Sequence, residues 1–284
     1  MKILTVLLSL LIAINVDAQI TNNTSFEREG WKLVFNDEFD GTALNGDKWI
    51  TWFPYTDDGS DQCAFCRTHG NENQIFLDRN VVLEGGVLQI IAKQEDTVWF
   101  NERRNYTSGT VHARQAFGHG RYEIRAKLPA GAGFWPAIWT FGQVGTEVDI
   151  MEGGMQKTNR YHASLHEWNI KDFLHKRVNV DFDLTADFHV YGIEWDSETI
   201  KFFIDDREVW QVCKYTRNVK RNPKKCDKKK RAVQPIFPAD NEKLFLILGL
   251  GIGNELSPFT KSPDEKTVFP NKFEIDFVRI YQKE

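Results

Sequence analysis

Short segments in which apolar and polar residues alternate recur along this chain of 284 residues. The clearest is residues 273–281, Phe-Glu-Ile-Asp-Phe-Val-Arg-Ile-Tyr. Others lie at residues 31–35, 120–128, 188–195 and 200–204 with 208–210, and residues 200–204 and 208–210 are expected to form a hairpin across Asp205 and Asp206. Residues 86–92 form a short apolar segment, and residues 244–252 are apolar throughout, as expected for a central strand. A period of two residues is typical of β-strands with one buried face. Because no segment has a long helical period, we predict an all-β fold, a sandwich or a barrel.

The N-terminus has the composition of a secretory signal peptide. Lys2 precedes an apolar run that ends at Ile14, and residues 16–18, Val-Asp-Ala, offer small side chains for cleavage. The run is too short to span a membrane, and no other segment is apolar enough. We therefore predict a signal peptide at residues 1–18, a short polar lead at 19–30, and one domain at 31–284. The expected location is secreted or periplasmic.

The four cysteines are consistent with export. An even number of cysteines in an oxidising compartment favours disulfides, and the spacing suggests the pairs Cys63–Cys66 and Cys213–Cys226. The sequence does not fix this connectivity. The alternative is a structural zinc site, which is disfavoured because only one pair of cysteines has metal-ligand spacing.

Charge is unevenly distributed along the chain, whose formal net charge is −4. Residues 214–231 hold ten basic residues against a single acid, Asp227. One interpretation is a solvated loop. The other is a binding patch for a polyanion. A nucleic acid is a poor candidate for an exported protein, but a sulfated polysaccharide is not.

Three acids lie close together in residues 147–152, Glu-Val-Asp-Ile-Met-Glu. In a strand, Glu147 and Asp149 share one face, whereas Glu152 falls on the other. One extra residue, a β-bulge near residues 150–151, would return Glu152 to the face of the first two. Because neighbouring carboxylates cannot all ionise, one pKa must rise, and the roles of ionised nucleophile and protonated acid separate. A retaining glycosidase needs such a pair, roughly 5–5.5 Å apart. The alternatives are a solvent-facing acidic strand or a calcium site.

Aromatic residues and histidines flank the acidic segment. Residues 131–139, with Trp135 and Trp139, precede it, and two tryptophans four positions apart suit a platform for sugar rings. Residues 161–168 follow it, and His162, Ser164 and His166 would share one face of a neighbouring strand. A structural role for the histidines stays open, particularly for His162.

Together these segments resemble glycoside hydrolase family 16, and within it the laminarinase-like β-1,3-glucanases. That family carries E-x-D-x-E or the bulged form E-x-D-x-x-E, and residues 147–152 have the bulged form. Residues 37–41, Asp-Glu-Phe-Asp-Gly, look like the opening strand of the family, and residues 70–76 are similar to its N-x-E-x-Q-x-[YF] segment. The resemblance extends over nearly all of residues 31–282.

The resemblance implies a β-jelly-roll sandwich of two antiparallel sheets, one of which forms an open concave cleft. It assigns the nucleophile to Glu147 and the acid/base to Glu152, with Asp149 between them as a hydrogen-bonding partner of the nucleophile. The residues expected to bind substrate in the cleft are Asn71, Trp135, Trp139, His166 and Trp168. One departure is Gly249, where relatives usually carry Asn; the missing side chain would leave space in the cleft.

A structural calcium ion is also implied by the resemblance. Its ligands would be the acids Glu38 and Asp276 and the carbonyl oxygen of Gly86. Ordinary surface charge is the alternative for both acids. Catalysis itself would need no cofactor.

We therefore expect an endo-acting, retaining hydrolase of a β-linked polysaccharide, best matched by β-1,3- or mixed β-1,3/1,4-glucan. Expected partners are the polysaccharide alone, without nucleic acid or membrane, and the expected state is a monomer. One alternative is a hydrolase of sulfated algal galactans such as carrageenan, porphyran or agar, which residues 214–231 would favour. Another is a non-catalytic glucan-binding protein, which the intact Glu147 and Glu152 argue against.

Overall fold

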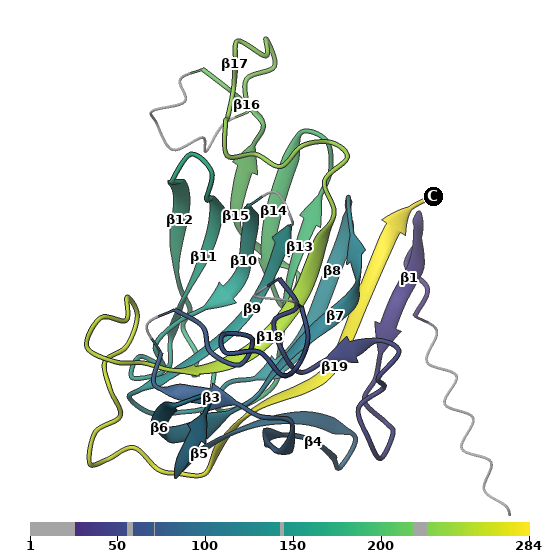
Figure 1. Cartoon of the computed structure of the whole chain (residues 1–284). Coiled ribbons are helices and arrows are strands. Elements are labelled where there is room, and N and C mark those ends of the chain that lie inside the picture. Colours follow the sequence, from purple (N-terminus) through teal and green to yellow (C-terminus); the bar gives the residue numbers. More distant parts are fainter. Residues whose placement is uncertain (1–25, 56–58, 71, 143–144, 218–225) are drawn as a thin grey trace, which may run out of the picture.

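A computed structural model describes residues 26–55, 59–70, 72–142, 145–217 and 226–284, and these form a sandwich of two β-sheets (Figure 1). The predicted signal peptide, residues 1–18, lies outside the described residues. Within the described ranges the only helix is the 3-10 turn η1 (Asp78–Asn80), and no helix is long and apolar enough to cross a membrane. The predicted all-β class is confirmed.

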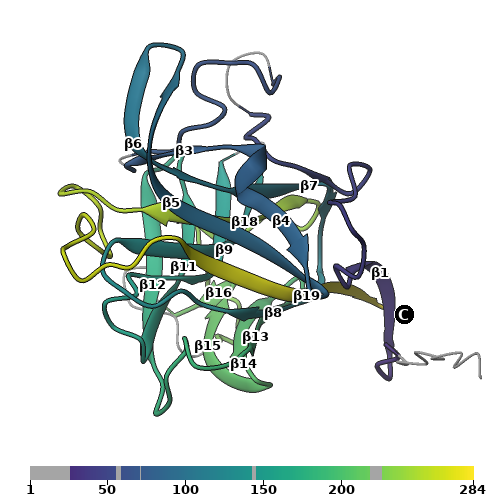
Figure 2. The same cartoon turned by 90° about the horizontal axis from the view of Figure 1, so that it is seen from below.

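The larger sheet has ten strands in the order β15-β14-β13-β8-β19-β5-β6-β3, with β1 beside β19 and β4 beside β5. Its strands are β1 (Trp31–Asp37), β3 (Gln74–Phe76), β4 (Val81–Glu84), β5 (Val87–Trp99), β6 (Glu102–Ser108), β8 (Gly120–Lys127), β13 (His189–Trp195), β14 (Thr199–Ile204), β15 (Arg207–Cys213) and β19 (Asn271–Lys283). The last strand in the sequence, β19, pairs with β1, β5 and β8, so the C-terminal segment closes the middle of this sheet (Figure 2).

The smaller sheet has seven strands in the order β12-β11-β10-β9-β18-β7-β2. Its strands are β2 (Trp49–Ile50), β7 (Thr110–Phe117), β9 (Phe134–Gly142), β10 (Thr146–Glu152), β11 (Arg160–Glu167), β12 (Asp172–Asn179) and β18 (Leu244–Ile252). The acidic segment forms β10, between β9 and β11. Residues far apart in the sequence therefore meet on the two sides of the acids.

Strand β18 shows how the two faces of this sheet differ. Leu246, Leu248 and Leu250 are fully buried and belong to the core between the sheets. The intervening Gly249 and Gly251 face the opposite way and line a cavity. Since both faces of the strand are covered, it is apolar throughout, and its predicted central position in a sheet is confirmed.

The predicted hairpin near residue 205 is also confirmed. Strands β14 and β15 pair antiparallel across Asp205 and Asp206. Both residues have positive φ angles, 48° and 62°, as a two-residue hairpin turn of this kind requires, and Asp tolerates that conformation better than most residues.

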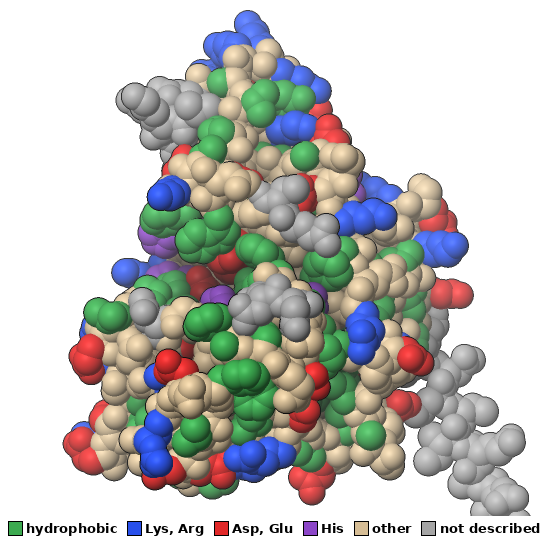
Figure 3. All heavy atoms as spheres, viewed as in Figure 1, with side chains coloured by type: hydrophobic (Ala, Val, Ile, Leu, Met, Phe, Trp, Pro, Cys, Tyr) green, Lys and Arg blue, Asp and Glu red, His purple; other side chains and the backbone are tan. Residues whose placement is uncertain are grey.

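Both predicted cysteine pairs are disulfides, Cys63–Cys66 and Cys213–Cys226. No cysteine is left free, so the zinc alternative is wrong. The second disulfide joins Cys213, just before the basic segment 214–231, to Cys226 within it. At the two ends of this segment, β16 (Tyr215–Thr216) pairs with β17 (Ala232–Val233). Lysine and arginine side chains gather there at the top of the molecule (Figure 3). Positions 218–225 of this segment lie outside the described residues.

Candidate active site

The acids of β10 share one face because the strand contains a bulge. Opposite β9, Asp149 pairs with Trp139 and Met151 pairs with Ile138, so one residue of β10 is extra. The register on the β11 side shifts at the same place. Val148, Ile150 and Met151 are buried in the core, while the three acids line a cavity on the other face. The predicted bulge is confirmed.

The cavity has a volume of about 600 Å³ and lies over the middle of the seven-stranded sheet. Strands β9, β10, β11, β12 and β18 contribute side chains to it, together with residues from the segment that precedes β3. Acidic and histidine side chains gather in a recess over β10 and β11 between apolar side chains (Figure 3). An acidic centre bordered by aromatic rings suits a polar ligand with apolar ring faces.

Glu147 is held by a tryptophan. The indole Nε1 of Trp168 donates a hydrogen bond of 2.9 Å to Oε2 of Glu147. Burial and the neighbouring Asp149 raise the pKa of Glu147, whereas His166 and the Trp168 hydrogen bond lower it. Burial prevails and the net pKa of Glu147 is raised to about 8, so the contacts with His166 and Trp168 limit the rise.

Glu152 is more deeply enclosed. It is 9% exposed, and its carboxyl group accepts hydrogen bonds from Nε1 of Trp135 (3.3 Å) and Oγ of Ser164 (3.4 Å). Burial first, and then Asp149 and Glu147, raise its pKa well above the ordinary value. Because Glu152 is buried and lies next to two other carboxyl groups, both of which raise its pKa, it is the natural holder of a shared proton.

Asp149 lies between the two glutamates and contacts a histidine. Its Oδ2 is 3.1 Å from Nε2 of His166, and the Asp149 side chain is almost fully buried. Burial lowers the pKa of His166, but Asp149 and Glu147 outweigh it, and the net shift is upward. Ligand atoms of Glu147, Asp149 and His166 lie within 4.8 Å of one another, the one such cluster within the described ranges. A cation bound there would occupy the same carboxylates that the bulge brings together.

The model of glycosyl hydrolases family 16 matches residues 70–242, more than half of the chain. The chain belongs to this family. The resemblance inferred from the sequence is therefore confirmed, and the chain is a family 16 glycoside hydrolase.

Individual relatives agree with this membership. The family 16 chain is 29% identical to a β-glucanase of Rhodothermus marinus over 97% of its own length and 93% of that protein. It is 27% identical to a glucan endo-1,3-β-glucosidase of Cryptopygus antarcticus, covering 90% and 93% of the two chains. Among solved structures, the laminarinase catalytic domain of Thermotoga maritima matches with a TM-score of 0.73 and 25% identity, over 90% of this chain and all of that one.

Four of the five predicted substrate-binding residues of this family 16 chain line the cavity: Trp135, Trp139, His166 and Trp168. Trp139 is 8% exposed, whereas Trp168 is 54% exposed, so they border the cavity at different depths. The fifth, Asn71, lies outside the described residues.

His69 and Glu72 also line the cavity, although the sequence analysis did not single them out. Nδ1 of His69 is 3.2 Å from Oε1 of Glu72, and Gln74 donates a hydrogen bond to the other oxygen of Glu72. An added Cβ at Gly251 would lie 3.1 Å from the Glu72 carboxyl carbon, so the bare backbone of β18 makes room for this acid. Glu72 lies in residues 70–76, which are similar to the N-x-E-x-Q-x-[YF] segment of the family. That similarity was the sequence feature that could have identified Glu72 as a site residue.

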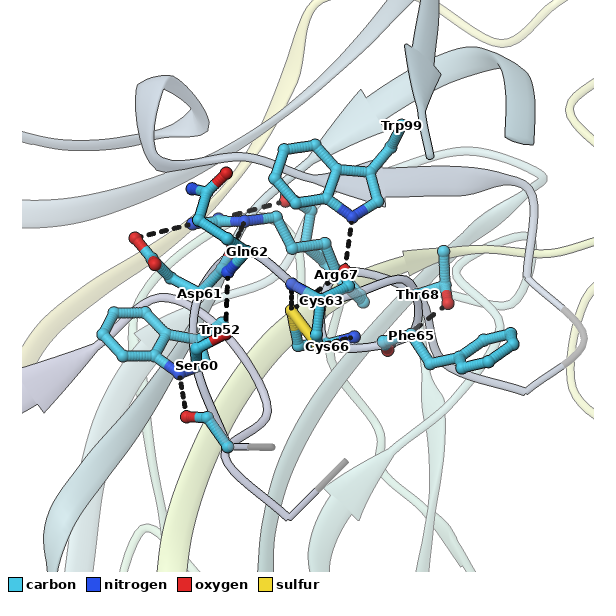
Figure 4. The surroundings of a disulfide bond; sticks show 12 residues. Trp52, Ser60, Asp61, Gln62, Cys63, Phe65, Cys66, Arg67, Thr68 and Trp99 are labelled. Carbon is cyan, nitrogen blue, oxygen red and sulfur yellow. Dashed lines mark hydrogen bonds and ion pairs between the residues drawn. A yellow bond between two sulfur atoms is a disulfide. The ribbon is translucent and has the colours of Figure 1, made fainter. Parts of the chain in front are cut away.

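The Cys63–Cys66 disulfide lies in the loop that leads to His69 (Figure 4). Nε1 of Trp99 donates a 2.8 Å hydrogen bond to the carbonyl oxygen of Cys63. The backbone N–H of Phe53, whose ring lines the cavity, donates to the carbonyl oxygen of Cys66 at 3.0 Å. The cross-linked loop thus supports one wall of the cleft.

Strand β12 contributes side chains that sequence analysis missed. Phe173, His175 and Arg177 alternate along it and line the cavity. Their cross-strand partners on β11 are His166, Ser164 and His162. The signal was the alternation Phe-x-His-x-Arg in residues 173–177. It was easily overlooked because most of the strand is exposed and few of its residues are apolar.

Gly249 lines the cavity, as its place in the sequence predicted. The prediction that its missing side chain leaves free space needs correction. An added Cβ would lie 3.3 Å from Oγ1 of Thr110, which donates a hydrogen bond to the carbonyl oxygen of Leu248. Thr110 therefore occupies part of the space next to Gly249.

The residues predicted to bind calcium are partnered by arginines. Both carboxylate oxygens of Glu38 accept hydrogen bonds from Arg279, at 3.0 and 2.6 Å. Asp276 accepts one from Arg125 at 2.6 Å. Gly86 lies in the turn between β4 and β5. Two carboxylates already neutralised by guanidinium groups do not fit a calcium ion in this arrangement, and the calcium site stays a prediction.

Proposed function

We propose that this family 16 hydrolase is a secreted, endo-acting, retaining enzyme that cleaves β-1,3- or mixed β-1,3/1,4-glucan. The observation that carries the proposal is the bulge in β10, because it puts Glu152 on the face of Glu147 in a cavity bordered by Trp135 and Trp139. A retaining mechanism requires two carboxyl groups on one side of the scissile bond with different protonation states.

In the proposed mechanism Glu152 donates its proton to the glycosidic oxygen while Glu147 attacks the anomeric carbon. The bond to the leaving sugar breaks, and a covalent glycosyl–Glu147 intermediate forms. Glu152, now ionised, takes a proton from water, which attacks the anomeric carbon and releases Glu147. Both inversions occur at the same carbon, so the product keeps the β-configuration.

The neighbouring groups assist these steps electrostatically. Trp168 donates to Glu147, and its N–H can stabilise the carboxylate before attack and when it is released. Asp149 raises the pKa of Glu152, which favours the protonated acid at the start of the cycle. His166, 3.1 Å from Asp149, limits the accumulation of negative charge around the two glutamates.

The relatives support the choice of glucan. They are a β-glucanase, a glucan endo-1,3-β-glucosidase and a laminarinase. The two disulfides are consistent with export, and the proposed state is a monomer. A non-catalytic glucan-binding role is disfavoured because Glu147 and Glu152 are both present with hydrogen-bond partners of their own.

Product analysis on a panel of polysaccharides tests the proposal. The panel contains laminarin, mixed-linkage glucan, agar, porphyran and carrageenans. We expect β-glucans to be cleaved, with viscosity falling early relative to the release of reducing ends, as endo-cleavage requires. Glu147→Gln and Glu152→Gln should each abolish turnover while the far-UV circular dichroism spectrum is unchanged. Exclusive cleavage of the galactans, or full activity of either variant, would contradict the proposal.

A further inference from the structure

One end of the cleft carries four basic side chains. Arg160 and His162 come from β11, and His175 and Arg177 come from β12, and all four line the cavity. His162 lies between the acid and an arginine, because its cross-strand partners are Glu152 on β10 and Arg177 on β12. Basic and histidine side chains are visible at the left end of the recess (Figure 3).

These basic groups lack acidic partners within the described part of the chain, since neither Arg160 nor Arg177 takes part in an ion pair there. The carboxyl group opposite His162 on β10 is Glu152, whose pKa is raised well above its ordinary value by burial and by its acidic neighbours. Arg177 lies opposite His162 and Arg160 lies opposite Asn179, so neither guanidinium group has an acidic cross-strand partner. Their presence is therefore unexplained by the fold itself.

The surroundings of His162 also carry more positive than negative charge. Burial, followed by His175, Arg177 and Arg160, lowers the pKa of His162 to about 4. Its Nδ1 is buried and has no hydrogen-bond partner. A positive field and an unused polar atom at one end of a cleft are both features that an anionic ligand would satisfy.

Aromatic rings accompany the basic groups. Phe259 contacts the ring of His162 with centroids 4.8 Å apart, and Phe173 lies 6.1 Å from His175. Phe173 is 55% exposed and lines the cavity, so its ring face is open to a ligand there. Apolar ring faces beside guanidinium groups suit a sugar ring that also carries a negative charge.

We propose that the β11–β12 end of the cleft is a subsite for a sugar unit bearing a sulfate ester or a carboxylate. This inference rests on the proposed function, because it assigns a substituent to the polysaccharide that the cleft cleaves. Arg160 and Arg177 supply paired N–H donors, the geometry that oxyanions prefer. The basic segment 214–231 is a weaker candidate, since its Lys214, Lys230 and Arg231 are already paired with acids.

Three forms of one backbone test the proposal: neutral laminarin, partially sulfated laminarin, and laminarin oxidised at C6 to carry carboxylates. Wild-type enzyme should have a lower KM for at least one charged form than for neutral laminarin. In the double variant R160Q/R177Q, the ratio of kcat/KM on that charged form to kcat/KM on laminarin should fall about 10-fold or more. The matched control K228Q/K229Q removes the same charge from exposed positions of the basic segment and should leave the ratio unchanged.

Binding separates failure of the subsite from failure of the proposed function. Mobility in native gels that contain each polysaccharide measures affinity without turnover. Retardation by sulfated laminarin alone identifies a sulfate subsite, retardation by the oxidised form alone identifies a carboxylate subsite, and R160Q/R177Q should abolish either. If wild type cleaves no polysaccharide but shows this arginine-dependent retardation, the subsite stands and the glucanase proposal fails. Equal retardation by all three forms, or loss in K228Q/K229Q instead, would overturn the subsite.

Discussion

The indole N–H of Trp168 donates a hydrogen bond of 2.9 Å to Oε2 of Glu147, although the Trp168 side chain is 54% exposed. The ring also stacks on His166, with an interplanar angle of 6° and centroids 5.4 Å apart. His166 in turn lies 3.1 Å from Asp149. The Trp168 ring thus orients the proposed nucleophile, Glu147, and covers His166, which offsets the negative charge of the neighbouring acids.

Replacing this ring tests its contact with Glu147. Trp168→Phe keeps an aromatic face but removes the N–H donor. A hydrogen bond to a carboxylate favours the ionised form, so its loss raises the pKa of Glu147 further. Since the nucleophile must be ionised, the acidic limb of the kcat/KM profile should move to higher pH, and kcat should fall roughly 10-fold. Steady-state kinetics between pH 4 and 9 measure both effects, with Trp31→Phe, far from the cavity, as the control. An unchanged acidic limb would show that the Trp168 N–H does not influence the pKa of Glu147.

The buried acids also predict how stability depends on pH. The pKa of Glu152 is raised in the folded state, so the folded protein binds more protons than the unfolded chain above the ordinary glutamate pKa. Unfolding free energy should therefore fall as pH rises from that value towards the folded pKa. Glu152→Gln removes this dependence and should raise Tm at pH 7 by about 2–4 °C, the shift expected for 1 kcal/mol in a domain of this size. Thermal melts at pH 4.5 and 7 provide the comparison, and a lower Tm of the variant at pH 7 would count against the account.

Gly251 makes room for Glu72. Gly251→Ala would put a methyl group 3.1 Å from the carboxyl carbon of Glu72, tighter than ordinary packing, and displace that acid into the cleft. We expect kcat/KM on laminarin to fall about 10-fold, because small displacements of positioned groups are costly in catalysis. The matched control is Gly46→Ala, since a Cβ at position 46 meets nothing within 4 Å. Equal activity of the two variants would show that the position of Glu72 does not affect catalysis.

The predicted calcium site gives a test of metal removal. Because Arg279 and Arg125 already neutralise Glu38 and Asp276, we expect EDTA to change Tm by less than about 1 °C. Differential scanning calorimetry with EDTA and with millimolar calcium measures this. A large rise in Tm with calcium that Asp276→Asn abolishes would restore the site and show that the arginine contacts are displaced by the ion.

Local patterns in the sequence predict much of the fold. The alternation in residues 273–281 and the apolar residues of β18 predict strands because burial on one or both faces dictates them directly. The bulge in β10 is predictable for a similar reason, since three acids at the spacing of residues 147, 149 and 152 can share a face only if one residue is extra.

Relationships between strands are harder to predict. The Trp168–Glu147 hydrogen bond depends on the register of β10 and β11, and that register is not encoded in either segment alone. The basic groups on β12 escaped attention because Arg177 gains significance only when it lies opposite His162. The arginine partners of Glu38 and Asp276 are likewise distant in sequence, at 241 and 151 positions.

The central claim is that Glu147 is the nucleophile and Glu152 the acid/base of a retaining hydrolase. The most direct measurement is the anomeric configuration, by proton NMR, of the glycosyl azide formed from an activated aryl β-laminaribioside in the presence of azide. Glu147→Ala should yield the α-azide, because azide replaces the nucleophile in a single inversion. Glu152→Ala should yield the β-azide, because azide intercepts the glycosyl–Glu147 intermediate. The same configuration from both variants, or the two configurations exchanged, would contradict the assignment.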